Sequence, residues 1–167
     1  MCFEAASLKL ALGIDPGIAT TGYGVIRLLD DGGMEAVDFG VIVTPPDLPV
    51  HRRLLLLHGD LQELFAKHHP DTCAVEKLFF QKNVSTAIAV GEARGIVMLT
   101  IAEMNLEVAE YTPNEVKQAV AGYGSAEKRQ VQEMVRTLLG LPEIPKPDDA
   151  ADALAIAITH LSTQRYE

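Results

Sequence analysis

The 167-residue sequence contains little cysteine, few basic residues and no long uninterrupted hydrophobic run. Cys2 and Cys73 are too few for a disulfide framework and form no metal-ligand pair by spacing, which is typical of a reducing compartment. The most apolar segment, 88–104, is interrupted by charged side chains, so we expect no membrane span, which needs about 20 apolar residues. Glu4 stands where a secretory signal would carry positive charge. We therefore expect a cytoplasmic protein with no membrane partner.

The shortage of basic residues bears on possible nucleic-acid partners. The 14 Lys and Arg residues face 23 Asp and Glu residues, a net charge of −9, whereas nucleic-acid phosphates require Lys and Arg. Positive charge nevertheless leads locally, in segments 77–94 and 113–136. Carboxylates that bind divalent cations also count as negative here, although the bound cation neutralises them. Net charge therefore does not exclude a nucleic-acid partner.

The order of apolar runs and chain breakers predicts an α/β fold. We find no repeat, low-complexity tract or long linker, so we expect a single domain over residues 1–167. Three early strands should form antiparallel hairpins, and each later strand should join in parallel through a crossover helix. The resulting mixed five-stranded sheet, flanked by helices, has the order of the ribonuclease H-like fold. The predicted strands are 8–14, 22–29, 34–44, 72–79 and 107–111. Two helices are predicted at 54–65 and 85–104, a third begins after its cap Thr112, a fourth is capped by Ser125 and ends near Gly140, and the last covers about 148–160.

Two acidic residues stand at the ends of apolar strands. Asp15 follows the first strand in an Asp-Pro-Gly sequence, which an ordinary turn would also explain. Glu76 closes the fourth strand, where a solvated strand end is the simple alternative. Neither residue alone requires a function.

Two further acids lie near the start of the last helix. Asp149 and Asp152 are three residues apart, which places both carboxylates on one helical face. Helix capping or compensation of the helix dipole would explain Asp148 or Asp149. Asp152 escapes that explanation because its apolar neighbours indicate a buried helix, where an unpaired carboxylate is costly.

Together the four acids predict a metal site. If the first and fourth strands are adjacent, Asp15 and Glu76 are neighbours, and the last helix can bring Asp149 and Asp152 against them. Crowded carboxylates repel one another unless cations hold them, and a set of oxygen ligands selects Mg²⁺ or Mn²⁺. Two such ions, roughly 3.5 to 4 Å apart, can activate a water and stabilise the leaving oxygen of a phosphodiester. The predicted chemistry is phosphodiester hydrolysis.

Six blocks of sequence stand out, in order along nearly the whole chain: Gly13-Ile14-Asp15-Pro16-Gly17 with Thr21-Gly22-Tyr23-Gly24, Val75-Glu76-Lys77-Leu78-Phe79-Phe80 with Lys82-Asn83, Gly91-Glu92-Ala93-Arg94-Gly95, Glu110-Tyr111-Thr112-Pro113, Gly124-Ser125-Ala126-Glu127-Lys128, and Asp149-Ala150-Ala151-Asp152-Ala153-Leu154. Together these blocks resemble the RuvC family of bacterial Holliday junction resolvases. The resemblance implies a ribonuclease H-like nuclease that acts as a homodimer on four-way junction DNA in homologous recombination and DNA repair. It also implies symmetric nicks on two opposed strands, dependence on Mg²⁺ or Mn²⁺, and collaboration with the RuvA and RuvB branch-migration proteins.

The resemblance also assigns roles to individual residues. The four acidic positions of the family fall on the same four residues that the spacing argument selects: Asp15, Glu76, Asp149 and Asp152. Asp148 is an extra acid, which leaves open whether Asp148 or Asp149 binds metal, although the Asp-Ala-Ala-Asp pattern favours Asp149.

The remaining assignments concern DNA contacts. The family places an aromatic residue, here Phe79, against an unpaired base at the junction crossover, although an adjacent aromatic pair also suits a core. It places Lys117 and Lys128 near the scissile phosphate, with Lys128 among the catalytic groups, and Lys82 is a further DNA contact. Surface lysines without a role are the alternative for all three.

The predicted helix 85–104 carries Gly91 and Gly95, whose spacing allows another backbone to come close. In the resembling family this helix contributes to the dimer contact, and packing within one chain would explain the glycines equally well.

Two rival functions deserve comparison. Asp15-Pro16-Gly17 with Thr21-Gly22 resembles the phosphate loop of actin-like ATPases, which need two such domains where this length supplies one. A junction-binding module without catalysis is the second rival, and the presence of all four acids argues against it.

Overall fold

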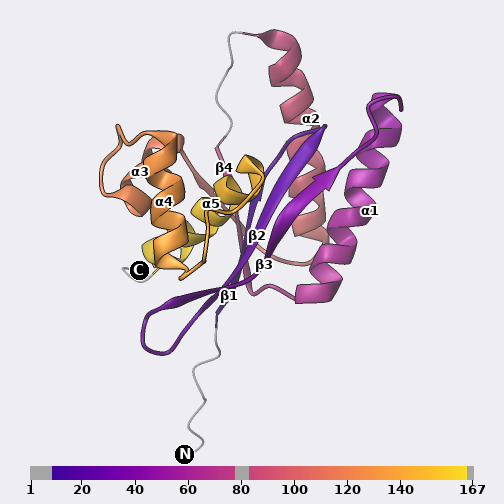
Figure 1. Ribbon diagram of the computed structural model, residues 1–167. Coiled ribbons are helices and arrows are strands. Elements are labelled where there is room, and N and C mark those ends of the chain that lie inside the picture. The colour runs from indigo at the N-terminus through magenta and orange to yellow at the C-terminus, as the bar shows by residue number, and fades with distance from the viewer. Residues whose placement is uncertain (1–8, 78–82, 165–167) are drawn as a thin grey trace, which may run out of the picture.

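The computed structural model describes residues 9–77 and 83–164, which form five strands and five helices (Figure 1). The strands are β1 (Leu10–Asp15), β2 (Thr20–Leu28), β3 (Met34–Val43), β4 (Thr72–Glu76) and β5 (Val108–Tyr111). The helices are α1 (Val50–His68), α2 (Val84–Glu103), α3 (Pro113–Ala121), α4 (Lys128–Leu138) and α5 (Asp148–Gln164).

The strands form one mixed sheet in the order β3-β2-β1-β4-β5. The β1–β2 and β2–β3 pairs are antiparallel, whereas β4 joins β1 and β5 joins β4 in parallel. This arrangement confirms the predicted mixed sheet, with three antiparallel strands followed by parallel additions. The predicted boundaries differ from the observed ones by a few residues, and β4 already ends at Glu76.

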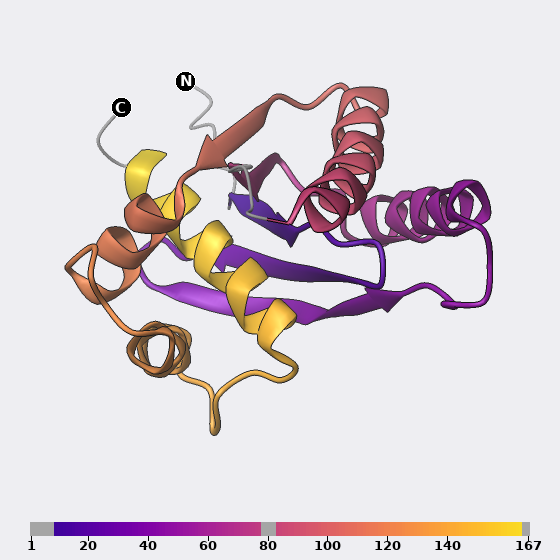
Figure 2. The ribbon, with the colours of Figure 1, turned by 90° about the horizontal axis from the view of Figure 1, so that it is seen from above.

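Helices cover both faces of the sheet (Figure 2). Helix α5 lies across one face and α3 and α4 pack against it, while α1 and α2 cover the other face. Alternate residues of β1 point to opposite faces of the sheet: Leu12 and Ile14 pack with α1 and α2, whereas Ala11 packs with α5. The same alternation directs the side chain of Asp15 toward α5.

The helix starts test two predicted caps. Thr112 caps α3 as predicted: its hydroxyl accepts a hydrogen bond from the backbone N–H of Glu115 at 3.1 Å. The prediction of Ser125 as the next cap is wrong, because α4 begins later and Glu127 is its N-cap. The backbone N–H of Glu127 donates to Oε1 of Gln130 at 2.8 Å. Ser125 lies in the preceding turn, which the N–H of Ala126 closes by donating to the carbonyl of Tyr123 at 3.3 Å.

Helix α2 bears on the expectation that the chain has no membrane span. Its 20 residues are long and apolar enough to cross a membrane by length and composition, and a single such helix is weak evidence for a span. The helix packs on the sheet layer through the buried Ala93, Val97 and Ile101. Arg94 of α2 also forms an ion pair with Glu110 of β5. These contacts are those of a helix packed on a sheet.

Candidate active site

The ends of β1 and β4 bring two of the predicted acids together. Ile14 pairs with Val75 in the parallel register, so the next residues, Asp15 and Glu76, lie side by side at the same edge of the sheet. Val75 is buried toward α1 and α2, and Ala74 toward α5. Glu76 therefore faces α5, as Asp15 does.

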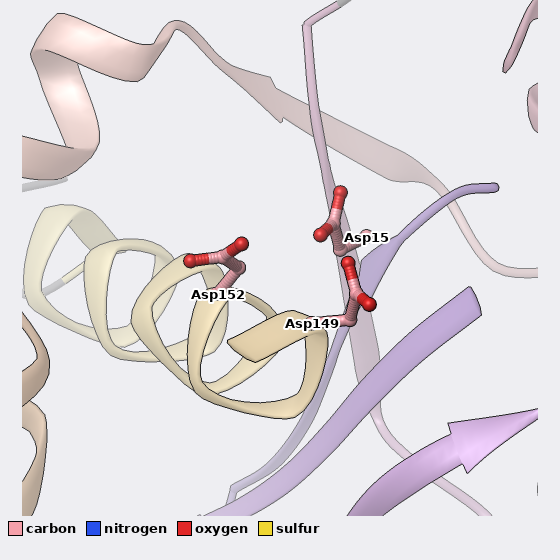
Figure 3. A group of neighbouring side chains, drawn as sticks. All are labelled: Asp15, Asp149 and Asp152. Atoms are coloured by element: carbon pink, nitrogen blue, oxygen red, sulfur yellow. The ribbon is translucent and has the colours of Figure 1, made fainter. Parts of the chain in front are cut away.

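Helix α5 completes the cluster (Figure 3). One carboxylate oxygen from each of Asp15, Asp149 and Asp152 lies within 4.8 Å of the other two. All three side chains are partly buried. Asp148 is not in this group; its Oδ2 lies 3.2 Å from Nζ of Lys128. Of the adjacent pair, the structure therefore brings Asp149 to Asp15.

Glycines of β1 and β2 allow α5 to lie this close to the sheet. A Cβ at Gly22 would overlap the backbone carbonyl of Asp149, and a Cβ at Gly13 would overlap that of Ala153. A Cβ at Gly24 would stand 2.7 Å from Cδ2 of Leu154. Side chains at these positions would push α5 outward, and Asp149 with it.

Gly22→Ala is therefore expected to separate Asp149 from Asp15. We expect a loss of about 1 to 3 kcal/mol in the free energy of unfolding from overpacking. Nuclease activity should fall by at least about tenfold, since a displacement of 1 Å near reacting groups can cost up to 100-fold. Urea unfolding and a cleavage assay measure the two effects.

Gly59→Ala is the matched control because a Cβ at Gly59 of α1 meets no atom within 4 Å. The control should retain activity and gain slightly in stability, as alanine favours helix. Full activity of Gly22→Ala would contradict the assigned role of this close approach.

Electrostatics set the cluster apart from an ordinary polar surface. Burial raises the pKa of Asp15 to about 8, and repulsion from Asp152, Glu76 and Asp149 adds to the rise. Burial likewise raises the pKa of Glu76 and that of Asp152, although Lys128 opposes the rise at both. At neutral pH a positive charge among the oxygens would therefore favour full ionisation of the cluster. A set of carboxylate oxygens fits a hard divalent cation such as Mg²⁺ or Mn²⁺.

A cavity of about 270 Å³ opens beside the cluster. Glu76 and Asp152 stand on its acidic side, and Lys117 and Lys128 supply positive charge to the same cavity. The two lysines also act on Glu76, since both lower its pKa against the effect of burial. The remaining lining is largely apolar: Pro113, Val116, Val131, Ala155 and Ile156. Acids, cations and apolar side chains in one lining together suit an anion attached to a sugar or base.

The predicted site residues thus have different outcomes. The structure brings Asp15, Asp149 and Asp152 into one cluster, and it places Glu76, Lys117 and Lys128 around the adjoining cavity. Phe79 and Lys82 lie outside the described residues, so their assignments stay predictions.

Sequence reasoning missed a buried polar link behind the site. His160 of α5 is hydrogen-bonded through Nε2 to Oγ1 of Thr72 at 2.6 Å and through Nδ1 to the hydroxyl of Tyr111 at 2.7 Å. Burial, with a smaller effect of Lys9, lowers the pKa of His160 to about 4, so its ring is neutral at pH 7. The link joins α5 to β4 and β5. Its apolar helical neighbours were the one available sequence signal for burial.

The mixed sheet has the ribonuclease H-like fold, and the carboxylate cluster at the ends of its central strands is a candidate metal site. Together they define a ribonuclease H-like enzyme. Residues 11–160 match the family model described as crossover junction endodeoxyribonuclease RuvC. The chain belongs to the RuvC family.

Known proteins agree with this assignment. The chain is 54% identical to the crossover junction endodeoxyribonuclease RuvC of Thermomicrobium roseum over 156 residues, which cover 92% of this chain and 93% of the relative. It is 56% identical to that of Chloroflexus aggregans over 153 residues, with the same coverage. The structure of T. thermophilus RuvC in complex with a Holliday junction substrate matches with a TM-score of 0.86 and 36% identity, over 94% of this chain and 96% of that chain.

Proposed function

We propose that this protein resolves Holliday junctions by metal-dependent nicking of two opposed strands at symmetric positions, in homologous recombination and DNA repair. One observation carries the proposal: the clustered oxygens of Asp15, Asp149 and Asp152 adjoin a cavity with two lysines, in a chain of the RuvC family. The acids suit metal ions, and the lysines suit a phosphate.

We propose two ions, Mg²⁺ or Mn²⁺, as the cofactors. Asp15, Asp149 and Asp152 would hold one ion, and Glu76 with Asp152 would hold the other at the cavity. When bound, such a pair supplies an activated water on one side of the phosphodiester and stabilises the leaving oxygen on the other. The partly buried carboxylates would fix the positions of the ions. Because the carboxylates repel one another, binding of cations between them is favoured.

The lysines are proposed to bind the DNA backbone beside the acids. Lys117 and Lys128 line the cavity, where ammonium groups can hold phosphate oxygens and stabilise charge that develops in the transition state. Phe79 is proposed to stack on an unpaired base at the crossover, and Lys82 to contact the backbone. These two assignments rest on the family resemblance of their sequence block.

Cleavage of a synthetic junction tests the proposal. End-labelled four-way junction DNA is incubated with the protein and either Mg²⁺ or Mn²⁺, and the nicks are mapped on all four strands. We expect paired nicks at symmetric positions on two opposed strands, with little cutting of linear duplex of the same sequence. Junction binding without any cutting would instead favour the non-catalytic binding module.

A homodimer is the further proposal, since a symmetric dimer matches the two-fold symmetry of the junction. Helix α2 offers a face for the second copy: Val84, Ile88 and Leu99 are 69%, 56% and 50% exposed. Their spacings of four and eleven residues place them on one side of the helix. A Cβ at Gly95, on the same side, would meet no atom of the chain within 4 Å. This apolar face, with a small residue between larger ones, suits contact with a second α2.

Ile88→Glu is expected to shift the protein to a monomer, because a charge buried in an apolar interface costs several kcal/mol. Junction cleavage should fall with dimer content. Sedimentation velocity at several protein concentrations measures the association.

Leu138→Glu on α4, where Leu138 is 42% exposed, is the matched control and should remain a dimer. Equal dimerisation of the two variants would show that the α2 face is not the interface.

RuvA and RuvB are the proposed protein partners, and the cytoplasm is the proposed compartment. The support is membership of the RuvC family, together with a substrate that branch migration would deliver. The protein's net charge of −9 makes diffuse attraction to DNA weak, so delivery by junction-bound partners would assist it.

A further inference from the structure

Lys128 is held between two aspartates of α5. Its Nζ lies 3.2 Å from Oδ2 of Asp148 and 3.8 Å from Oδ2 of Asp152. One turn further along α4, Gln132 donates a hydrogen bond from Nε2 to Oδ1 of Asp148 at 3.2 Å. Both oxygens of Asp148 therefore contact α4.

Consecutive side chains of a helix do not face the same way, so Asp148 contacts α4 whereas Asp149 joins the acid cluster. The contacts with α4 contribute little to stability, because the side chains of Asp148 and Lys128 are 67% and 58% exposed and water screens such a pair. A largely exposed ion pair beside a reactive cavity can still decide where a long flexible side chain lies.

The alternative positions of Lys128 are close at hand. Glu76 and Asp152 line the same cavity, and each is a carboxylate that attracts the ammonium group. A lysine that closed on Asp152 would neutralise an oxygen that the metal site needs. A phosphate in the cavity would then meet an ammonium that is already tightly paired.

We propose that Asp148 is a positioning residue for strand cleavage. With Gln132, it holds the Lys128 ammonium in the lining of the cavity and keeps it from moving closer to Asp152 than the present 3.8 Å. Asp148 itself binds neither metal nor DNA in this proposal. The inference rests on the proposed function, because it concerns the same cavity.

A double-mutant cycle tests this role through single-turnover cleavage of a four-way junction. Asp148→Asn is expected to lower the maximal rate by about 10- to 100-fold, the range expected when a reacting group is misplaced. The protein concentration for half-maximal rate should not change. In a Lys128→Ala background, Asp148→Asn should cause no further loss. Asp148→Glu should recover part of the rate, since its carboxylate can still reach the flexible lysine.

Binding of Mn²⁺ to the DNA-free protein, measured by calorimetry, gives a readout independent of cleavage. Asp148→Asn should weaken Mn²⁺ binding when Lys128 is present and leave it unchanged in the Lys128→Ala background. A direct effect of the Asp148 charge on the ion would persist in both backgrounds and would overturn the proposal.

Glu133→Gln is the matched control, an acid-to-amide change on α4 that breaks contacts to Arg129 and Arg136 away from the cavity. It should leave cleavage unchanged, and thermal melting should show all variants folded. Additive losses in the cycle, or an Asp148→Glu variant no faster than Asp148→Asn, would overturn the positioning role. Absence of cleavage by the wild-type protein would instead contradict the proposed function itself.

Discussion

Asp15→Asn is expected to abolish junction cleavage while leaving junction binding intact. The amide preserves the shape of the side chain but removes the negative charge at the centre of the cluster, where Asp15 meets both Asp149 and Asp152. Metal ions stabilise a transition state by several kcal/mol, and about 4 kcal/mol corresponds to roughly a thousandfold in rate. We therefore expect a loss of at least about a thousandfold in single-turnover cleavage.

Binding should survive because the proposed phosphate contacts come from lysines rather than from Asp15. Gel-shift titration without divalent ions measures it, and Asp47→Asn, a change at an exposed turn residue, is the control for the substitution itself. Asp15→Asn protein that cleaves within tenfold of the wild-type rate would sink the metal-site assignment. A parallel loss of binding would show that the substitution disturbs the fold.

The elements of the fold could be predicted because local signals agree with the final packing. Strands β1 and β2 are apolar runs closed by Asp-Pro-Gly and Asp-Asp-Gly-Gly sequences, and Thr112-Pro113 marks a helix start by local capping chemistry that tertiary contacts leave intact. The juxtaposition of Asp15 and Glu76 followed from strand order alone, since adjacent parallel strands end at the same edge of the sheet.

Other features depend on contacts between distant segments. The Asp-Ala-Ala-Asp pattern favours Asp149 as a ligand but does not place Asp148; its contacts with Lys128 and Gln132 come from α4. The requirement for glycine at position 22 likewise depends on α5, which passes over it.

The wrong cap illustrates a different limit. Ser125 is a good capping residue by type, but Gln130 can reach back to the N–H of Glu127, and the buried Ala126 fixes the turn before the helix. Caps at Ser125 and at Glu127 are both acceptable locally, and the packing of Ala126 favours the cap at Glu127. The composition of α2 was similarly ambiguous, because an apolar helix can meet a core, a second subunit or a lipid.

In the absence of divalent ions, the protein is expected to lose stability as the pH rises from 6.5 to 8. Asp15 has a pKa of about 8 in the folded protein, because of burial and neighbouring carboxylates, against an ordinary value of 3.8. Between these two values the folded state holds a proton that the unfolded state has released, so the free energy of unfolding falls with rising pH. His160 acts oppositely, since its pKa is lowered from 6.5 to about 4, but only below pH 6.5. Above that pH the Asp15 effect should dominate, at up to about 1.4 kcal/mol per pH unit.

Urea unfolding in a chelator at pH 6.5 and pH 8 measures this loss, for which we expect up to about 2 kcal/mol. Asp15→Asn should remove most of it and be more stable than wild type at pH 8, because the amide carries no proton to lose. Mn²⁺ should stabilise the wild-type protein more at pH 8 than at pH 6.5, since ion binding competes with the proton on Asp15. Asp47→Asn, the exposed control, should follow the wild-type curve. If wild type and Asp15→Asn show the same pH dependence in chelator, the proton is not held at Asp15, and the electrostatic account of the cluster is wrong.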